Sequence, residues 1–74
     1  MVLSDLNLGD RAVIKNINAD NQLKHRLYSF GLVRGEELEV RGCSLGKNTI
    51  EVDVDNTLIA LRVEEAKKIE VERV

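Results

Sequence analysis

The sequence offers few side chains with the chemistry of catalysis or metal binding. His25 is the only histidine, and the residues three and four positions after it are not cysteine or carboxylate residues that could complete a metal site. Cys43 is the only cysteine, and no paired base stands beside it to activate its thiol. We therefore predict no catalysis, no cofactor and no metal ligand, with His25 in solvent and Cys43 in a loop.

Two further patterns could bind an ion or a phosphate. Asp53 and Asp55 flank Val54 and would share one face of a strand, but an oxygen-ligated cation normally needs several more ligands. Alternating acids on a solvent face explain the pair at least as well. The segment from Gly31 to Gly35 lacks the Lys-Ser/Thr ending of a phosphate loop and follows a helix instead of a strand. It therefore predicts no nucleotide site.

Length and charge limit the classes of function. The chain has 74 residues and a formal net charge of −2, which indicates one small domain, residues 1–74. Acidic and basic residues are interleaved, unlike the one-sided basic field of a nucleic-acid binder. The only aromatic residues are Tyr28 and Phe30, too few for base stacking or for a groove that binds proline-rich peptides. A protein partner is the remaining expectation.

Cellular location follows from what the composition lacks. One cysteine cannot form an intrachain disulfide, which fits a reducing compartment. The longest apolar run, Leu58 to Leu61, is far too short to span a bilayer. The first residues lack the basic-then-apolar pattern of a signal peptide. We expect a cytoplasmic protein that does not insert into the membrane.

The strongest local signals lie around one helix, expected over about Asn21–Phe30. Asp20 precedes it, and its short carboxylate suits the N-cap because it can accept from the free amides of the first turn. Leu23, Leu27 and Phe30 share one stripe at helical spacing. We expect that stripe to be buried against the rest of the domain.

Two glycines and a leucine then predict how the helix ends. Gly31 can adopt the left-handed conformation that closes a helix at almost no steric cost. Leu32 follows at the position where a Schellman motif places an apolar residue against the last turn, here against Leu27. Gly35 gives a second turn before the next strand.

Short strands account for most of the remaining chain. In the first, Ile17 is out of phase with Ala12 and Ile14, so a bulge near Lys15 and Asn16 is expected to return it to the interior. The run Gly42–Asn48 is expected to be a loop, Asp55–Asn56 a two-residue hairpin turn, and Val63–Ala66 a single helical turn. Five strands are expected, over Arg11–Ile17, Glu36–Gly42, Thr49–Val54, Thr57–Arg62 and from Ile69 onward.

The pattern of the strands predicts the architecture. Thr57–Arg62 is apolar on both faces, which favours a central strand covered on both sides. Strands this short need closure to hide their edges. We therefore predict a mainly β, small SH3-like β-barrel of about five strands with one inserted α-helix and a short helical turn before the last strand. An OB-fold is the alternative, although its helix usually comes later in the strand order.

Four fragments, taken together, resemble the FeoA family of accessory proteins of bacterial ferrous-iron uptake. Two positions depart from the family pattern: Arg34 stands where a proline is common, and the segment 43–48 replaces a loop that is often proline-rich. The fragments are Leu6-x-x-Gly9-Asp10-x-Ala12-x-Ile14, Arg26-Leu27-x-x-Phe30-Gly31-Leu32-x-x-Gly35, Thr57-Leu58-Ile59-Ala60-Leu61-Arg62-x-Glu64-Glu65-Ala66 and Ile69-x-Val71.

The resemblance implies an SH3-like fold and a role in assisting FeoB, the membrane iron transporter with a cytosolic G-protein domain. It implies a regulatory, non-enzymatic protein, recruited to the inner face of the membrane by that partner. The C-terminal domain of DtxR-like metal-dependent repressors is a similar barrel. The alternative function is thus a stand-alone module of that type, which would regulate transcription or bind a repressor.

The expected partner surface lies on the outer side of the helix. At about 100° per residue, Tyr28 points roughly 130° away from the buried stripe, with Lys24 one turn earlier on the same side. Arg34 lies in the turn just beyond. Outward tyrosine and arginine residues often anchor interfaces, so Lys24, Tyr28 and Arg34 are the candidate partner-binding residues. The competing interpretation is that Tyr28 covers the edge of the barrel with its ring.

Overall fold

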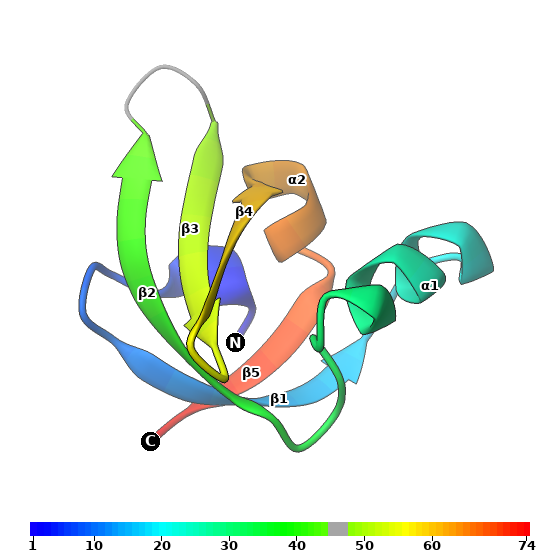
Figure 1. Cartoon of the computed structure of the whole chain (residues 1–74), viewed down its shortest axis with the longest axis horizontal. Coiled ribbons are helices and arrows are strands. Elements are labelled where there is room, and N and C mark those ends of the chain that lie inside the picture. The colour runs from blue at the N-terminus through cyan, green and yellow to red at the C-terminus, as the bar shows by residue number, and fades with distance from the viewer. Residues whose placement is uncertain (45–47) are drawn as a thin grey trace.

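In the described part of the chain, five strands form one antiparallel sheet in the order β4-β3-β2-β1-β5. The structure is a computed structural model that describes residues 1–44 and 48–74 (Figure 1). A short 3-10 helix precedes the first strand, α1 connects β1 to β2, and α2 connects β4 to β5. The elements are η1 (Leu3–Asp5), β1 (Arg11–Ile17), α1 (Asn21–Ser29), β2 (Glu37–Ser44), β3 (Thr49–Val54), β4 (Thr57–Arg62), α2 (Val63–Ala66) and β5 (Ile69–Arg73).

This arrangement confirms the predicted SH3-like architecture, with one difference in how the sheet ends. Within the described residues, the edge strands β4 and β5 do not pair with each other, so the sheet stays open instead of closing into a full barrel. The free side of β5 is covered in part by the N-terminus, because Val2 forms a bridge with Glu70 and the Val71 N–H donates to the Met1 carbonyl at 2.9 Å. The N-terminal segment thus covers part of the exposed backbone at the β5 edge, which closure of the sheet would otherwise have covered.

The core is built from alternating side chains of all five strands. The predicted bulge in β1 is confirmed, because the pairing with β5 shifts between Ile14 and Asn16. That extra residue returns Ile17 to the interior beside Ala12 and Ile14. Leu3 and Leu6 close the core beneath η1. The buried strand residues are Ala12, Ile14, Ile17, Leu38, Val40, Ile50, Val52, Val54, Ile59, Leu61, Ile69 and Val71.

The connection between β2 and β3 differs from the prediction, whereas the turn between β3 and β4 matches its prediction. The predicted loop Gly42–Asn48 is wrong at its start, because β2 continues through Gly42 and Cys43 to Ser44 after a register shift beside Gly42. Residues 45–47 of that loop lie outside the described part of the chain. The turn between β3 and β4 has Asp55 and Asn56 at φ of 51° and 63°, the conformation of a two-residue type I′ hairpin.

Strand β4 lies at an edge of the sheet, so the prediction of a central, doubly covered strand is wrong. Ile59 and Leu61 point into the core, whereas Leu58, at 59% exposure, and Ala60 face solvent. A continuous apolar run had suggested burial on both faces, but the strand pairs only with β3. The apolar outer face of this edge therefore needs another explanation.

Asp10 joins the segment before β1 to the end of β5. Its carboxylate accepts from the Asn7 backbone N–H at 2.7 Å and from the Arg73 guanidinium at 2.8 Å. These contacts, the backbone hydrogen bond first, lower the pKa of Asp10 from its ordinary value. The turn before β1 is therefore tied to the end of β5.

Both predicted caps of α1 are confirmed. The Leu23 N–H donates to the Asp20 carboxylate at 2.8 Å. At the other end, the Leu32 N–H donates to the Leu27 carbonyl at 3.0 Å and the Gly31 N–H to the Tyr28 carbonyl at 2.9 Å. This is the Schellman pattern, with α1 ending at Ser29, one residue before the predicted end.

Gly31→Val tests the importance of this cap. Gly31 has φ of 87°, and a Cβ built there would meet nothing within 4 Å, so the cost is conformational and not a clash. We expect a loss of about 1–3 kcal/mol in the free energy of unfolding, measured by urea denaturation. Gly31→Asn is the control, since asparagine tolerates this conformation and should lose less. Equal stability of the valine variant and the native protein would contradict the cap.

Candidate functional site

Helix α1 is placed beside the sheet by a small number of contacts. Figure 1 shows it extending to one side of the strands, with α2 between it and the upper end of β4. Leu27 is fully buried, and Leu23 packs against the core while remaining half-exposed. Most of the other residues of α1 are exposed. The helix therefore presents a wide surface to solvent.

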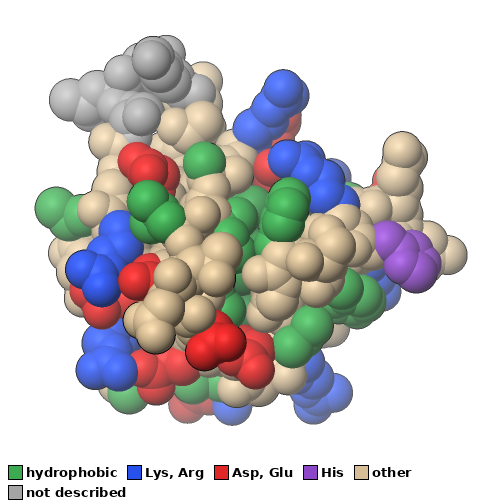
Figure 2. Space-filling view, viewed as in Figure 1, with side chains coloured by type: hydrophobic (Ala, Val, Ile, Leu, Met, Phe, Trp, Pro, Cys, Tyr) green, Lys and Arg blue, Asp and Glu red, His purple; other side chains and the backbone are tan. Residues whose placement is uncertain are grey.

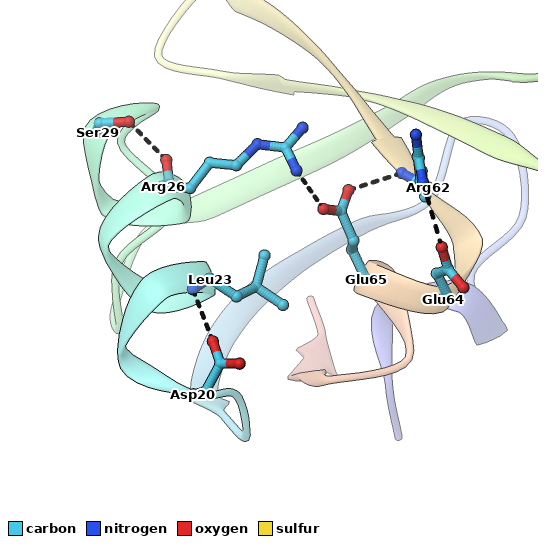
Figure 3. Close-up of polar contacts among 7 residues, drawn as sticks. All are labelled: Asp20, Leu23, Arg26, Ser29, Arg62, Glu64 and Glu65. Carbon is cyan, nitrogen blue, oxygen red and sulfur yellow. Dashed lines mark hydrogen bonds and ion pairs between the residues drawn. The ribbon is translucent and has the colours of Figure 1, made fainter.

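An ion pair between Arg26 and Glu65 joins α1 to α2 across 39 positions of sequence. Figure 3 shows the Arg26 side chain extending from α1 to the Glu65 carboxylate, whose other oxygen accepts the Arg62 backbone N–H at 3.0 Å. Glu65 is 8% exposed. A carboxylate this buried needs compensation of its charge, and both of its oxygens have it here. The sequence contained no local signal for this pair, because its members are distant along the chain.

The prediction that Phe30 completes the buried stripe of α1 is wrong. Its side chain is 40% exposed, and the Arg26 guanidinium lies over its ring, 5.8 Å from the centroid. The Schellman turn folds Leu32 back under the helix, where it is fully buried. Leu32 thus takes the interior position that helical periodicity had given to Phe30.

The three candidate partner-binding residues lie on α1 and the turn after it. Tyr28 is 46% exposed, Lys24 is half-buried one turn before it, and Arg34 is exposed. Tyr28 and Lys24 are four residues apart and so lie on the same side of the helix. Within the described residues, neither Lys24 nor Arg34 forms an ion pair. Tyr28 is thus partly covered and partly exposed, as both the interface and the edge-covering interpretation require.

Other candidates from the sequence lie elsewhere. His25 is exposed on α1, and Cys43 is exposed on β2 instead of lying in a loop. Asp53 pairs with Arg41 at 3.2 Å, whereas Asp55 lies in the hairpin turn, so the two acids do not share a strand face as expected. Among the described residues, no three histidine, cysteine or carboxylate side chains gather as a metal site would require.

Charged side chains on the strands are largely paired with opposite charges. Figure 2 shows basic and acidic groups side by side across the part of the surface formed by the sheet. Pairs of this kind stabilise a protein little, but they leave no broad field of one sign on the described strands. The pairs are Arg11–Glu37, Lys15–Glu72, Arg41–Glu39, Arg41–Asp53 and Arg73–Asp10.

A shallow depression of about 730 Å³ lies where α2 meets the start of β3. Across its lining, Arg62 and Glu64 form an ion pair of 3.6 Å. Sequence reasoning gave no sign of it, because its walls come from separate segments. The lining residues are Asn48, Thr49, Arg62, Val63, Glu64 and Lys67.

The topology and the inserted helix define a small SH3-like domain. Its fold is similar to a zinc-complexed structure from Stenotrophomonas maltophilia, described as a FeoA protein with an SH3 domain and as a candidate activating factor of ferrous iron transport. The TM-score is 0.84 at 34% identity, and the match covers 97% of this chain and 89% of that one. The family model of the FeoA domain matches residues 1–73. The chain belongs to the FeoA family.

Two relatives connect the family to iron transport. A candidate Fe(2+) transport protein A of Campylobacter jejuni is 44% identical over 71 residues, which is 96% of each chain. In Porphyromonas gingivalis, a fusion of Fe(2+) transport protein A with the Fe(2+) transporter FeoB is 33% identical over 72 residues. That match covers 97% of this chain and 8% of the fusion.

The fold also occurs in repressors. A manganese-dependent transcriptional repressor has a TM-score of 0.92 with this chain at 24% identity, over 36% of its own length. At that identity the likeness shows the fold alone.

None of the helices in the described part of this chain is long and apolar enough to cross a membrane.

Glu65→Gln tests the ion pair between the helices. The amide can still accept the Arg62 N–H, but it no longer balances the charge of Arg26, so we expect a loss of about 1–3 kcal/mol in the free energy of unfolding. The neighbouring change Glu64→Gln removes an exposed carboxylate and should cost less than about 0.5 kcal/mol. Thermal denaturation of both variants gives the comparison. Equal stability of the two would mean that the Arg26–Glu65 pair does not hold α1 in place.

Proposed function

We propose that this protein is a regulatory accessory of ferrous-iron uptake that binds a FeoB-type transporter through the outer side of α1. One observation carries the proposal: in Porphyromonas gingivalis a homologous domain and the transporter FeoB are parts of one polypeptide. Fusion keeps two domains at high local concentration, which favours pairs that act together. For a separate chain, a binding surface must supply the same association.

The exposed side of α1 has the residues for such a surface. Tyr28 offers an apolar ring with a polar end, the type of side chain that often anchors an interface. Lys24 and Arg34 add positive charge, and α1 carries no acidic residue along its length. A complementary partner surface would be acidic. In this proposal the protein is cytoplasmic and is held at the inner face of the membrane by its partner.

A binding role accounts for the described residues better than an enzymatic one. FeoA-family relatives are named for iron transport, and catalysis needs polar groups that converge with a base or nucleophile. The exposed His25 and Cys43 lie on different elements, α1 and β2, and neither has a partner that would activate it among the described contacts.

Tyr28→Ala tests the surface. We expect an unchanged melting temperature and a loss of at least about tenfold in affinity for the transporter, equivalent to about 1.4 kcal/mol of binding free energy. The measurement is capture of the co-expressed FeoB-type transporter from solubilised membranes by the tagged protein. Gln22→Ala, at an exposed position about 120° around the same helix from Tyr28, is the matched control and should bind normally. Normal capture by the Tyr28 variant, or its early unfolding, would place the interface elsewhere.

The repressor-type alternative is tested separately. A stand-alone module that regulates transcription should bind DNA or a repressor, so a gel-shift assay with genomic fragments should give a retarded complex. Under the transporter proposal no such complex forms and the membrane capture succeeds.

A further inference from the structure

The free edge of β4 has unpaired backbone groups at two residues. In an antiparallel ladder, alternate residues of a strand bond to their neighbour and the others direct N–H and C=O away from it. The two-residue turn makes Val54 and Thr57 a hydrogen-bonded pair. Leu58 and Ala60, of the opposite parity, therefore direct their N–H and C=O away from β3.

Two hydrogen bonds confirm this parity. Val63, which continues the series that bonds to β3, donates its N–H to the Asn48 carbonyl at 2.8 Å. Arg62, which belongs to the outward series, donates its N–H to Glu65 instead. The Glu65 carboxylate thus occupies the end of the free edge. Among the described residues, the outward groups of Leu58 and Ala60 have no hydrogen-bond partner.

The edge also lacks the protection that natural edge strands carry. Charged residues or a covering segment usually prevent pairing with another chain. Strand β5 has both, since Glu70 and Glu72 alternate along it and Val2 bridges to it. From Thr57 to Leu61, β4 has no charge, and Leu58 and Ala60 are exposed. An apolar, uncharged edge of this kind suits the addition of a strand.

The surroundings of the edge indicate what that strand would be. Figure 2 shows apolar side chains at the surface between β4 and α1. The basic groups at the end of this edge are already balanced, since Arg26 pairs with Glu65 and Arg62 pairs with Glu64 at 3.6 Å. An occupant should therefore be extended and apolar at alternate positions.

We propose that the free edge of β4 binds an extended segment of another protein by strand addition, a segment with apolar residues at alternate positions. The N–H and C=O groups of Leu58 and Ala60 would pair with its backbone, and its apolar side chains would cover the exposed side chains of these two residues. Where that protein is the FeoB-type transporter, the proposal rests on the function proposed above. It differs in using main-chain contacts at β4 instead of side chains on α1.

A peptide can test the edge without the transporter. The probe is a blocked hexapeptide of the sequence Thr-Ile-Glu-Val-Asp-Val, the chain's own β3 segment, which already pairs with the other side of β4. We expect saturable changes in the amide NMR signals of Leu58 and Ala60 at millimolar peptide, together with slower hydrogen exchange of these two amides. Absence of saturable changes there would overturn the proposal.

Ala60→Pro is the variant that should lose binding. It removes an outward N–H that makes no bond within the protein, and edge strands tolerate proline at such positions. We expect the fold to persist and peptide affinity to fall at least about tenfold, whereas Ala60→Ser, which keeps the N–H, should bind as the native protein does. If the proline variant does not fold, the exchange measurement on the native protein decides alone. Equal binding by the proline and serine variants would overturn main-chain pairing.

The two proposals fail separately. Peptide binding at Leu58 and Ala60 without capture of the transporter would remove the function proposed above and keep the strand-addition site. Capture of the transporter without peptide binding at β4 would keep the proposed function and remove the strand-addition site.

Discussion

The Glu65 carboxylate is the point on which the arrangement of the helices depends. It is nearly buried, and its charge is balanced by the Arg26 guanidinium and by the Arg62 backbone N–H. Removing either contact would leave part of a buried charge uncompensated, which is among the more costly changes a small domain can undergo. One side chain therefore joins the end of β4, the short helix α2 and the longer helix α1. This contact adds to the buried side chains of Leu27 and Leu32 in placing α1 beside the sheet.

The same contact explains why two distant fragments of the family pattern belong together. Arg26 opens the central fragment around the Gly31 turn, and Glu65 lies near the end of the fragment that runs through β4. Each fragment alone describes local structure: a capped helix, and a strand followed by a helical turn. In the folded chain they meet at the Arg26–Glu65 pair, and they supply both the exposed residues of α1 and the free edge of β4.

Local features could be predicted from the sequence because their causes are local. Asp20 caps α1, Gly31 ends it, and the pair Asp55–Asn56 turns the hairpin, since backbone sterics and short-range hydrogen bonds decide each of them. Two predictions failed for different reasons. Phe30 fits the helical stripe, but the helix ends at Ser29 and the turn at Gly31 brings Leu32 into the interior instead. The apolar run of β4 reads as a buried strand, yet no sixth strand pairs with it among the described residues. The exposure of Tyr28 could be predicted from helical periodicity. The unpaired backbone groups of Leu58 and Ala60 could be found only from the pairing register of β3 and β4.

An open sheet suits a small protein whose role is to bind. A domain of this size has little room for a deep cleft, so specificity has to come from its outer surface. Closing the sheet would satisfy the backbone of β4 within the protein and leave only side chains for recognition. With the edge open, main-chain groups at β4 and side chains on α1 are both available for recognition, and the Arg26–Glu65 pair links α1 to the end of β4 in advance. Pre-organisation of this kind lowers the entropy lost on binding, which matters most when the contact area is small.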